Sequence, residues 1–138
     1  NLTEAAFLLD RPYYPHPSEK EVEELLRGLA ALGAKKVVIT GVSFDGNSLG
    51  AAAYDSETDE ISYAFTDRVN AIFHGTGDVF GSALVGALMN DKSLQESMQI
   101  AALYTRGCIE NTLKFQPGRT YGVNFEEELP NYIKLLGK

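Results

Sequence analysis

Apolar and polar residues recur along the first third of this chain with the period of an α-helix. Residues 5–9 predict a short helix, which Arg11-Pro12 ends because the residue before a proline disfavours helical geometry. The apolar positions of residues 22–29 recur at helical intervals, and Ser18 precedes Glu21 in the spacing of a capping box. We therefore predict an amphipathic helix that begins after Ser18 and ends at Gly33.

Short β-branched and alternating runs follow this helix. Residues 36–40 predict a buried strand of an α/β sheet, closed by Gly41. Residues 49–54 and 60–65 predict two more strands that flank the polar stretch 55–59, which is typical of a hairpin. The acids of that stretch lack the spacing and the glycine of an EF-hand, so they indicate a solvated turn and not a calcium loop.

The second half of the chain reads as helical. Residues 76–89 predict a glycine-containing helix, and Ser93 with Glu96 forms a second capping-box spacing before a long helix to Leu113. Residues 116–118 end that helix, and residues 125–136 predict a terminal helix. Alternating helices and strands indicate the α/β class with a layered sheet. Three strands make a thin sheet, so either more strands precede Asn1 or the chain is a small autonomous domain.

Composition limits the partners of the chain. Its 138 residues are 44% hydrophobic, which is enough for one core, and its formal net charge is −7 with a pI near 4.8. This field disfavours nucleic acids and anionic membranes, so a phosphate site must be local. The apolar stretch 79–89 is well short of the roughly 20 residues that cross a bilayer. The single cysteine, Cys108, fits a reducing cytoplasm, and its apolar helical setting predicts a buried thiol.

The stretch His74-Gly75-Thr76-Gly77-Asp78 stands directly before a predicted helix. Its glycines allow a tight turn that exposes backbone N–H groups at the helix start, where an anion binds. Asp78 has two interpretations there. It complements the helix dipole, or it accepts a proton from a hydroxyl that attacks a phosphoryl group.

Three motifs in one order resemble the ribokinase-like (PfkB carbohydrate kinase) superfamily. They are Gly75-Thr76-Gly77-Asp78, an Asn-x-x-Glu motif formed by Asn1-Leu2-Thr3-Glu4, and Val38-Ile39-Thr40-Gly41 at a strand end. Within that superfamily the chain looks most like pyridoxal or pyridoxamine kinases. Related hydroxymethylpyrimidine kinases commonly have cysteine where this chain has Asp78, which favours the pyridoxal kinases.

The resemblance implies an architecture. Residues 1–138 would be the C-terminal, ATP-binding half of a three-layer α/β/α sandwich, without its N-terminal half. It also implies that Asp78 is the catalytic base for the substrate hydroxymethyl group. The backbone amides of Gly75 to Asp78 would form the anion hole, and Gly75, Thr76 and Gly77 would bind the nucleotide.

The other two motifs would bind the magnesium nucleotide. The resemblance implies that Asn1 and Glu4 act near Mg²⁺ and the phosphates of ATP, with Glu4 acting through metal-bound water. Thr40 would present its hydroxyl to the phosphates. The residues alone leave plainer alternatives open: Asn1 as a loop residue, Glu4 as a solvated first-turn acid and Thr40 as β-branched filler.

The function implied is ATP-dependent phosphorylation of the 5′-hydroxymethyl group of pyridoxal, pyridoxamine or pyridoxine in vitamin B6 salvage, in the cytoplasm. Family members are often dimers, so a homodimer is implied too. We expect the 138 residues alone to be inactive. A sugar kinase of the same superfamily and a non-catalytic nucleotide-binding fragment remain alternatives. Phe73 and the loop from Arg68 line an adenine pocket or belong to the core, and His74 has no second histidine or cysteine nearby for a metal site.

Overall fold

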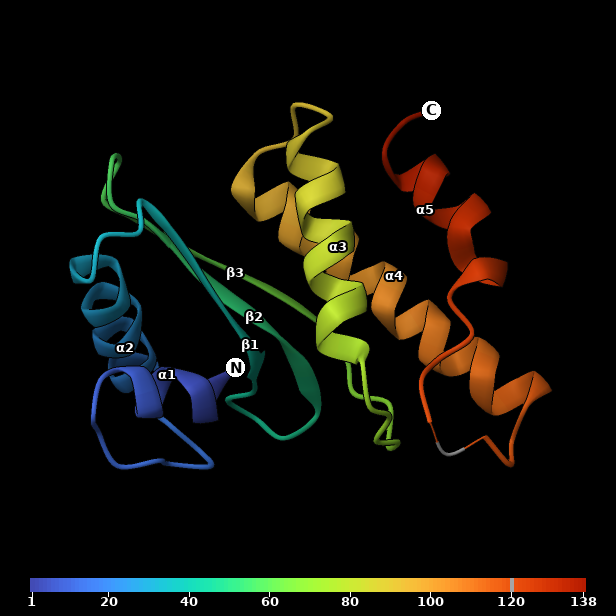
Figure 1. The fold of residues 1–138 in the computed structure, drawn as a ribbon, viewed down its shortest axis with the longest axis horizontal. Coiled ribbons are helices and arrows are strands. Elements are labelled where there is room, and N and C mark those ends of the chain that lie inside the picture. Colours follow the sequence, from blue (N-terminus) through green and yellow to red (C-terminus); the bar gives the residue numbers. More distant parts are fainter. Residues whose placement is uncertain (120) are drawn as a thin grey trace. The chain divides into compact units, whose positions relative to one another are not determined.

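The computed structural model describes residues 1–119 and 121–138. They form two compact units, Asn1–Asp67 and Arg68–Lys138. The first unit combines two helices with a sheet, and the second consists of helices (Figure 1). The chain therefore has the mixed α/β composition that its periodicity predicts.

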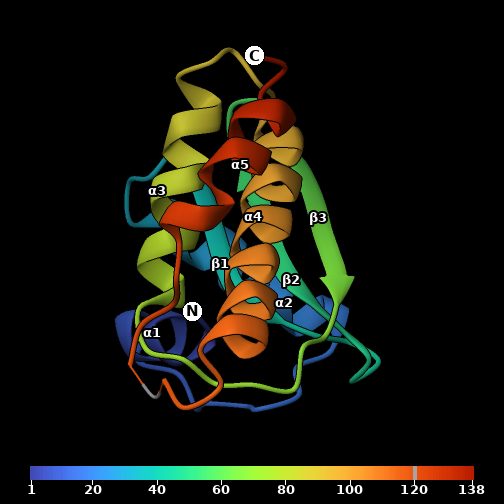
Figure 2. The same ribbon diagram turned by 90° about the vertical axis from the view of Figure 1, so that its right-hand side faces the viewer.

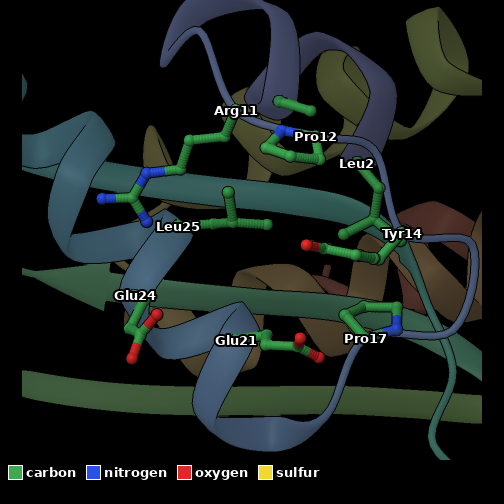
Figure 3. Close-up of a pocket in the computed structure, with 9 residues that line it drawn as sticks. Leu2, Arg11, Pro12, Tyr14, Pro17, Glu21, Glu24 and Leu25 are labelled. Atoms are coloured by element: carbon green, nitrogen blue, oxygen red, sulfur yellow. The ribbon is translucent and has the colours of Figure 1, made fainter.

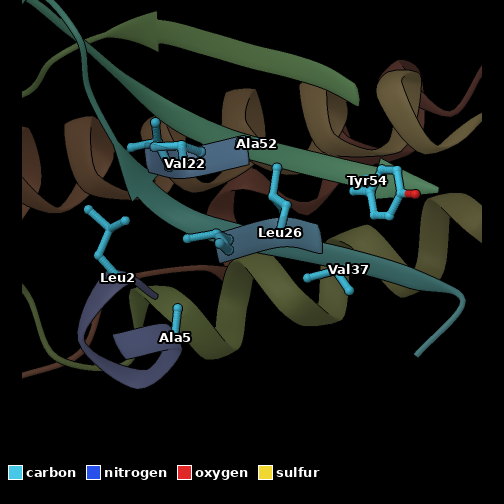
Figure 4. Packing of buried hydrophobic residues seen from close by; sticks show 9 residues of the cluster. Leu2, Ala5, Val22, Leu26, Val37, Ala52 and Tyr54 are labelled. Carbon is cyan, nitrogen blue, oxygen red and sulfur yellow. The ribbon is translucent and has the colours of Figure 1, made fainter. Parts of the chain in front are cut away.

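The first unit is built on a three-stranded antiparallel sheet in the order β1-β2-β3. Its strands are β1 (Lys36–Val42), β2 (Ser48–Asp55) and β3 (Glu60–Asp67), and its helices are α1 (Leu2–Leu8) and α2 (Glu19–Ala31). The apolar stripe of α2 buries Val22 and Leu26 completely against the sheet (Figure 4). The remaining buried members of this core are Leu2, Ala5, Val37, Ile39, Val42, Ala52 and Tyr54.

Strand β1 differs from its prediction in length and burial. Gly41 does not close the strand; it forms a bulge with φ of 74°, and the register shifts between Thr40 and Val42. The bulge returns Val42 to the core face that Ile39 occupies, because it inserts one extra residue between them. Burial alternates along β1, which is an edge strand, so the expectation of a strand buried along its length is wrong.

The predicted hairpin is confirmed, and two basic side chains pair with acids of its turn. Arg27 of α2 donates to Asp59 Oδ1 at 2.7 Å, and Lys36 lies 3.2 Å from Asp55 Oδ2. The Arg27 hydrogen bond lowers the pKa of the Asp59 carboxyl, and backbone hydrogen bonding from Glu57 lowers that of Asp55. Asp59 and Asp55 therefore connect the hairpin turn to α2 and β1 through ion pairs.

The second unit is a helical assembly. It contains α3 (Thr76–Leu88), α4 (Leu94–Phe115), a short 3₁₀ helix η1 (Glu126–Glu128) and α5 (Leu129–Leu135). Helices α3 and α4 lie side by side, and α5 packs on α4 (Figure 2). The predicted terminal helix 125–136 is shorter than expected, since its first turn is the 3₁₀ helix η1.

Tyr132 connects α5 to α3 through a hydrogen bond. Its hydroxyl donates to the carbonyl of Ala83 at 2.9 Å, and a Cβ on Gly86 would overlap that hydroxyl. Gly86 therefore provides the close approach that this contact needs.

Cys108 is fully buried in α4, as predicted. Burial raises the pKa of its thiol to about 11, so the thiolate that would act as a nucleophile is disfavoured at neutral pH. Across the described residues, none of the helices combines the length and apolar character that crossing a bilayer requires.

Candidate active site

The start of α3 differs from the starts of α1, α2 and α4. Each of those three helices begins with a complete capping box, in which side chains bond the first-turn amides. Helix α3 begins with Gly75, whose φ of 86° is left-handed, and has no side-chain cap. Because the first amides of a helix have no intrahelical acceptor, this start leaves N–H groups for another acceptor.

Space is available at this helix start. A Cβ added to Gly77 would meet no atom within 4 Å, and Gly77 does not have a positive φ. Neither packing nor backbone strain therefore explains a glycine there, whereas an anion close to the backbone would. The Thr76 hydroxyl is already engaged, since it donates a hydrogen bond to the Phe73 carbonyl at 3.4 Å. Thr76 can therefore bind an anion through its backbone amide.

Asp78 lies in the first turn of α3 with an exposed side chain. Within the described residues its carboxylate has no hydrogen bond or ion pair, so it is accessible for proton transfer. His74 is also exposed, directly before the turn. Phe73 is half-buried, and its place in an adenine pocket stays a prediction.

Asn1 and Glu4 are brought together at the start of α1. The Glu4 amide donates to Asn1 Oδ1 at 3.0 Å, and the Asn1 amino group donates to Glu4 Oε2 at 2.6 Å. In the described unit the two residues thus form a capping box, and both remain exposed.

Thr40 belongs to the same unit as Asn1 and Glu4. It is half-buried, next to the Gly41 bulge, and no hydrogen bond engages its hydroxyl in the described part of the chain. Helix α1 packs on β1, so the helix start and the strand end are held by one core. The Gly75–Asp78 turn belongs to the second unit.

Glu4 is the one carboxylate among the first-unit residues expected to act near Mg²⁺. The described residues contain no cluster of three or more His, Cys, Asp or Glu side chains that could hold a metal ion. Glu4 offers one exposed carboxylate, with Oε2 engaged by Asn1. A single carboxylate fits Mg²⁺ when water and nucleotide phosphates supply the other ligands, so Glu4 fits an outer position around this ion.

The structure shows two features of these motifs that the sequence predictions do not include, a helix cap at Asn1 and a bulge at Gly41. The Asn-x-x-Glu spacing is also that of a capping box, which identifies Asn1 as a helix cap. Val42 continues the apolar alternation only if one residue is skipped, and this skip at a glycine is the signal for a bulge.

Comparison with known proteins supports a common ancestry. A family model described as phosphomethylpyrimidine kinase matches residues 1–123. A Bacteroides thetaiotaomicron protein, provisionally assigned as a phosphomethylpyrimidine kinase and crystallised with pyridoxal, is 30% identical with a TM-score of 0.88. That match covers 96% of this chain and 47% of the other. No curated protein sequence matches the chain significantly.

Two pyridoxal kinases are similar in structure. The enzyme from Lactobacillus plantarum is 27% identical with a TM-score of 0.83, over 98% of this chain and 48% of that one. Leishmania donovani pyridoxal kinase, solved with ADP and pyridoxine, is 17% identical with a TM-score of 0.75, over 98% and 45%. The latter shows likeness of fold. The chain shares the ribokinase-like fold of these proteins and spans a little under half of their length.

Proposed function

This chain belongs to the phosphomethylpyrimidine kinase family, and we propose that it is the nucleotide-binding part of an ATP-dependent kinase. Its acceptor is the 5′-hydroxymethyl group of a vitamin B6 compound, in a salvage reaction that forms pyridoxal 5′-phosphate. The observation that carries the proposal is the uncapped start of α3 with the unengaged carboxylate of Asp78 in its first turn.

The proposed roles follow from this arrangement. The amides of Gly75, Thr76 and Gly77 stabilise the negative charge of the phosphoryl group during transfer, because the helix dipole and free N–H groups favour an anion there. Asp78 accepts the proton of the attacking hydroxyl.

The other motifs bind the nucleotide in this proposal. Asn1, Glu4 and Thr40 act on Mg²⁺ and the ATP phosphates, and Glu4 reaches the ion through water. The bound ion would neutralise phosphate charge.

A pyrimidine acceptor is the second candidate. The description of the matching family favours it, since that description names a kinase of a phosphomethylpyrimidine. One observation favours the B6 vitamer: the Bacteroides thetaiotaomicron relative was crystallised with pyridoxal. The family resemblance of the sequence points the same way, since it implies cysteine in place of Asp78 in the pyrimidine kinases.

Replacing Gly77 with alanine tests the anion site. A Cβ there occupies space that the phosphate needs, so we expect kcat/KM for ATP in the complete protein to fall at least tenfold. Alanine stabilises a helix interior by about 0.5–1 kcal/mol relative to glycine, so the melting temperature should not fall. Steady-state kinetics and thermal unfolding measure the two effects.

Gly81→Ala is the matched control, because Gly81 lies one turn further along α3 and its added Cβ also meets no atom within 4 Å. It should keep normal kinetics. Equal kinetics for the two variants would contradict an anion site at Gly77.

We also propose that these 138 residues alone lack kinase activity, which accords with the chain spanning under half of the length of its solved relatives. The purified chain of this length should show no pyridoxal-dependent ATP consumption above background. Robust turnover by a monomer of this length, established by light scattering, would refute the proposal.

A further inference from the structure

A pocket of about 250 Å³ lies within the first unit, between α1, the loop after it and α2. Its walls include the buried side chain of Leu2 on α1, Leu25 on α2, and two prolines of the loop, Pro12 and Pro17. The pocket is separate from the capping box of Asn1 and Glu4, neither of which lines it. None of the residues proposed above to bind the nucleotide or to transfer the proton lines it.

Two oppositely charged side chains, Arg11 and Glu24, line this pocket. Figure 3 shows the guanidinium of Arg11 and the carboxylate of Glu24 at the same side, with the Tyr14 hydroxyl reaching toward them from the other. No hydrogen bond or ion pair engages these three side chains anywhere in residues 1–119 and 121–138. Glu21 also lines the pocket, but one of its carboxylate oxygens accepts from the Ser18 amide at 2.7 Å. Arg11 and Glu24 are thus a cation and an anion available to a ligand.

We propose that this pocket binds a free α-amino acid with an aliphatic or aromatic side chain. The carboxylate and ammonium of such a ligand are attached to one carbon atom, and so require a cation and an anion at the same side of a pocket. Arg11 pairs with the carboxylate through its planar fork of donors, and Glu24 pairs with the ammonium. The ligand side chain lies against Leu2, Leu25 and Pro12.

Size and rigidity agree with this class of ligand. The volume of about 250 Å³ lies below the roughly 300–1,000 Å³ of pockets that hold drug-sized ligands, which suits a ligand as small as an amino acid. Prolines fix the backbone of the loop, and Leu9 packs against Gly28, which holds α1 to α2. A pocket formed before binding loses less entropy when the ligand enters.

Calorimetric titration of the complete protein, without ATP or pyridoxal, tests the proposal. Leucine and phenylalanine should bind with millimolar or better dissociation constants. Glycine lacks the side chain, isoamylamine lacks the carboxylate and 4-methylpentanoate lacks the ammonium, so each should bind at least tenfold more weakly. Absence of binding by leucine and phenylalanine, or equal binding of isoamylamine, would overturn the proposal.

Two substitutions locate the binding. Arg11→Gln and Glu24→Gln should each weaken leucine binding at least tenfold. The control for Glu24→Gln is Glu23→Gln, which also removes one negative charge, at the neighbouring position of α2 outside the pocket lining. It should leave the affinity unchanged. Leucine binding that survives in both pocket variants would place the amino acid elsewhere and contradict the assignment.

Discussion

Replacing Asp78 with asparagine in the complete protein is expected to lower kcat by about 10²–10⁴-fold, the usual contribution of a general base. Asparagine keeps the size and polarity of the side chain but cannot accept the proton of the acceptor hydroxyl. The affinity for ATP should change little, because the phosphates are bound by backbone amides in this account. Steady-state kinetics with a B6 vitamer, and calorimetric titration with Mg-ATP, measure the two quantities.

The matched control is Asp91→Asn. Asp91 is an exposed acid of the same unit, in the turn after α3, and its φ of 60° is one that asparagine tolerates. This variant should turn over normally. If Asp78→Asn also kept near-normal turnover, Asp78 would be a residue that complements the helix dipole and not the base.

The largest expected effect on stability comes from Gly50→Ala in β2. A Cβ at this position would overlap the carbonyl oxygen of Ala64 and would lie 2.8 Å from the Cα of Phe65, and both belong to the backbone of β3. Backbone atoms cannot rotate away as a side chain does, so β2 and β3 must separate. We expect the free energy of unfolding to fall by about 3 kcal/mol, the upper part of the range for overpacked sites.

Urea unfolding of the complete protein, followed by circular dichroism, measures this loss. Ser62→Ala is the comparison, because it trims a half-buried side chain of β3 and adds no atom to the sheet. It should cost under about 1 kcal/mol. A Gly50 variant as stable as the Ser62 variant would show that the two strands are not as close as described.

Much of the fold could be predicted, because local signals and tertiary packing agree. The capping boxes at Ser18 and Ser93 begin α2 and α4 where the sequence places them, and the hairpin forms around the polar stretch 55–59. The errors lie where long-range contacts decide. Gly41 continues β1 as a bulge because Val42 has a place in the core, and the skipped residue in the apolar alternation is only a weak local signal of it.

The candidate site could be predicted only in part. The Gly75–Asp78 motif is local, so its glycines and acid already indicate an uncapped helix start that favours an anion. The roles of Glu4 and Thr40 depend on groups that other parts of the protein and the nucleotide supply. Their own structure shows a helix cap and a strand position next to a β-bulge, and both features also serve stability.

The pocket beside α1 illustrates the same limit. Arg11 and Glu24 are 13 positions apart in the chain, and no motif connects them. They face one pocket because α1 and α2 pack on the same core. Sequence patterns identify elements and contiguous motifs, whereas sites assembled from separate elements emerge with the fold.

The central claim is tested most directly by ATP consumption of the protein from its complete natural gene. The assay contains magnesium and offers pyridoxal, pyridoxamine, a hydroxymethylpyrimidine and ribose separately. The account predicts turnover with a B6 vitamer and little with the pyrimidine or the sugar. Turnover with the pyrimidine or ribose alone would contradict the proposed acceptor, and no turnover with any of the four would contradict the assignment as a kinase.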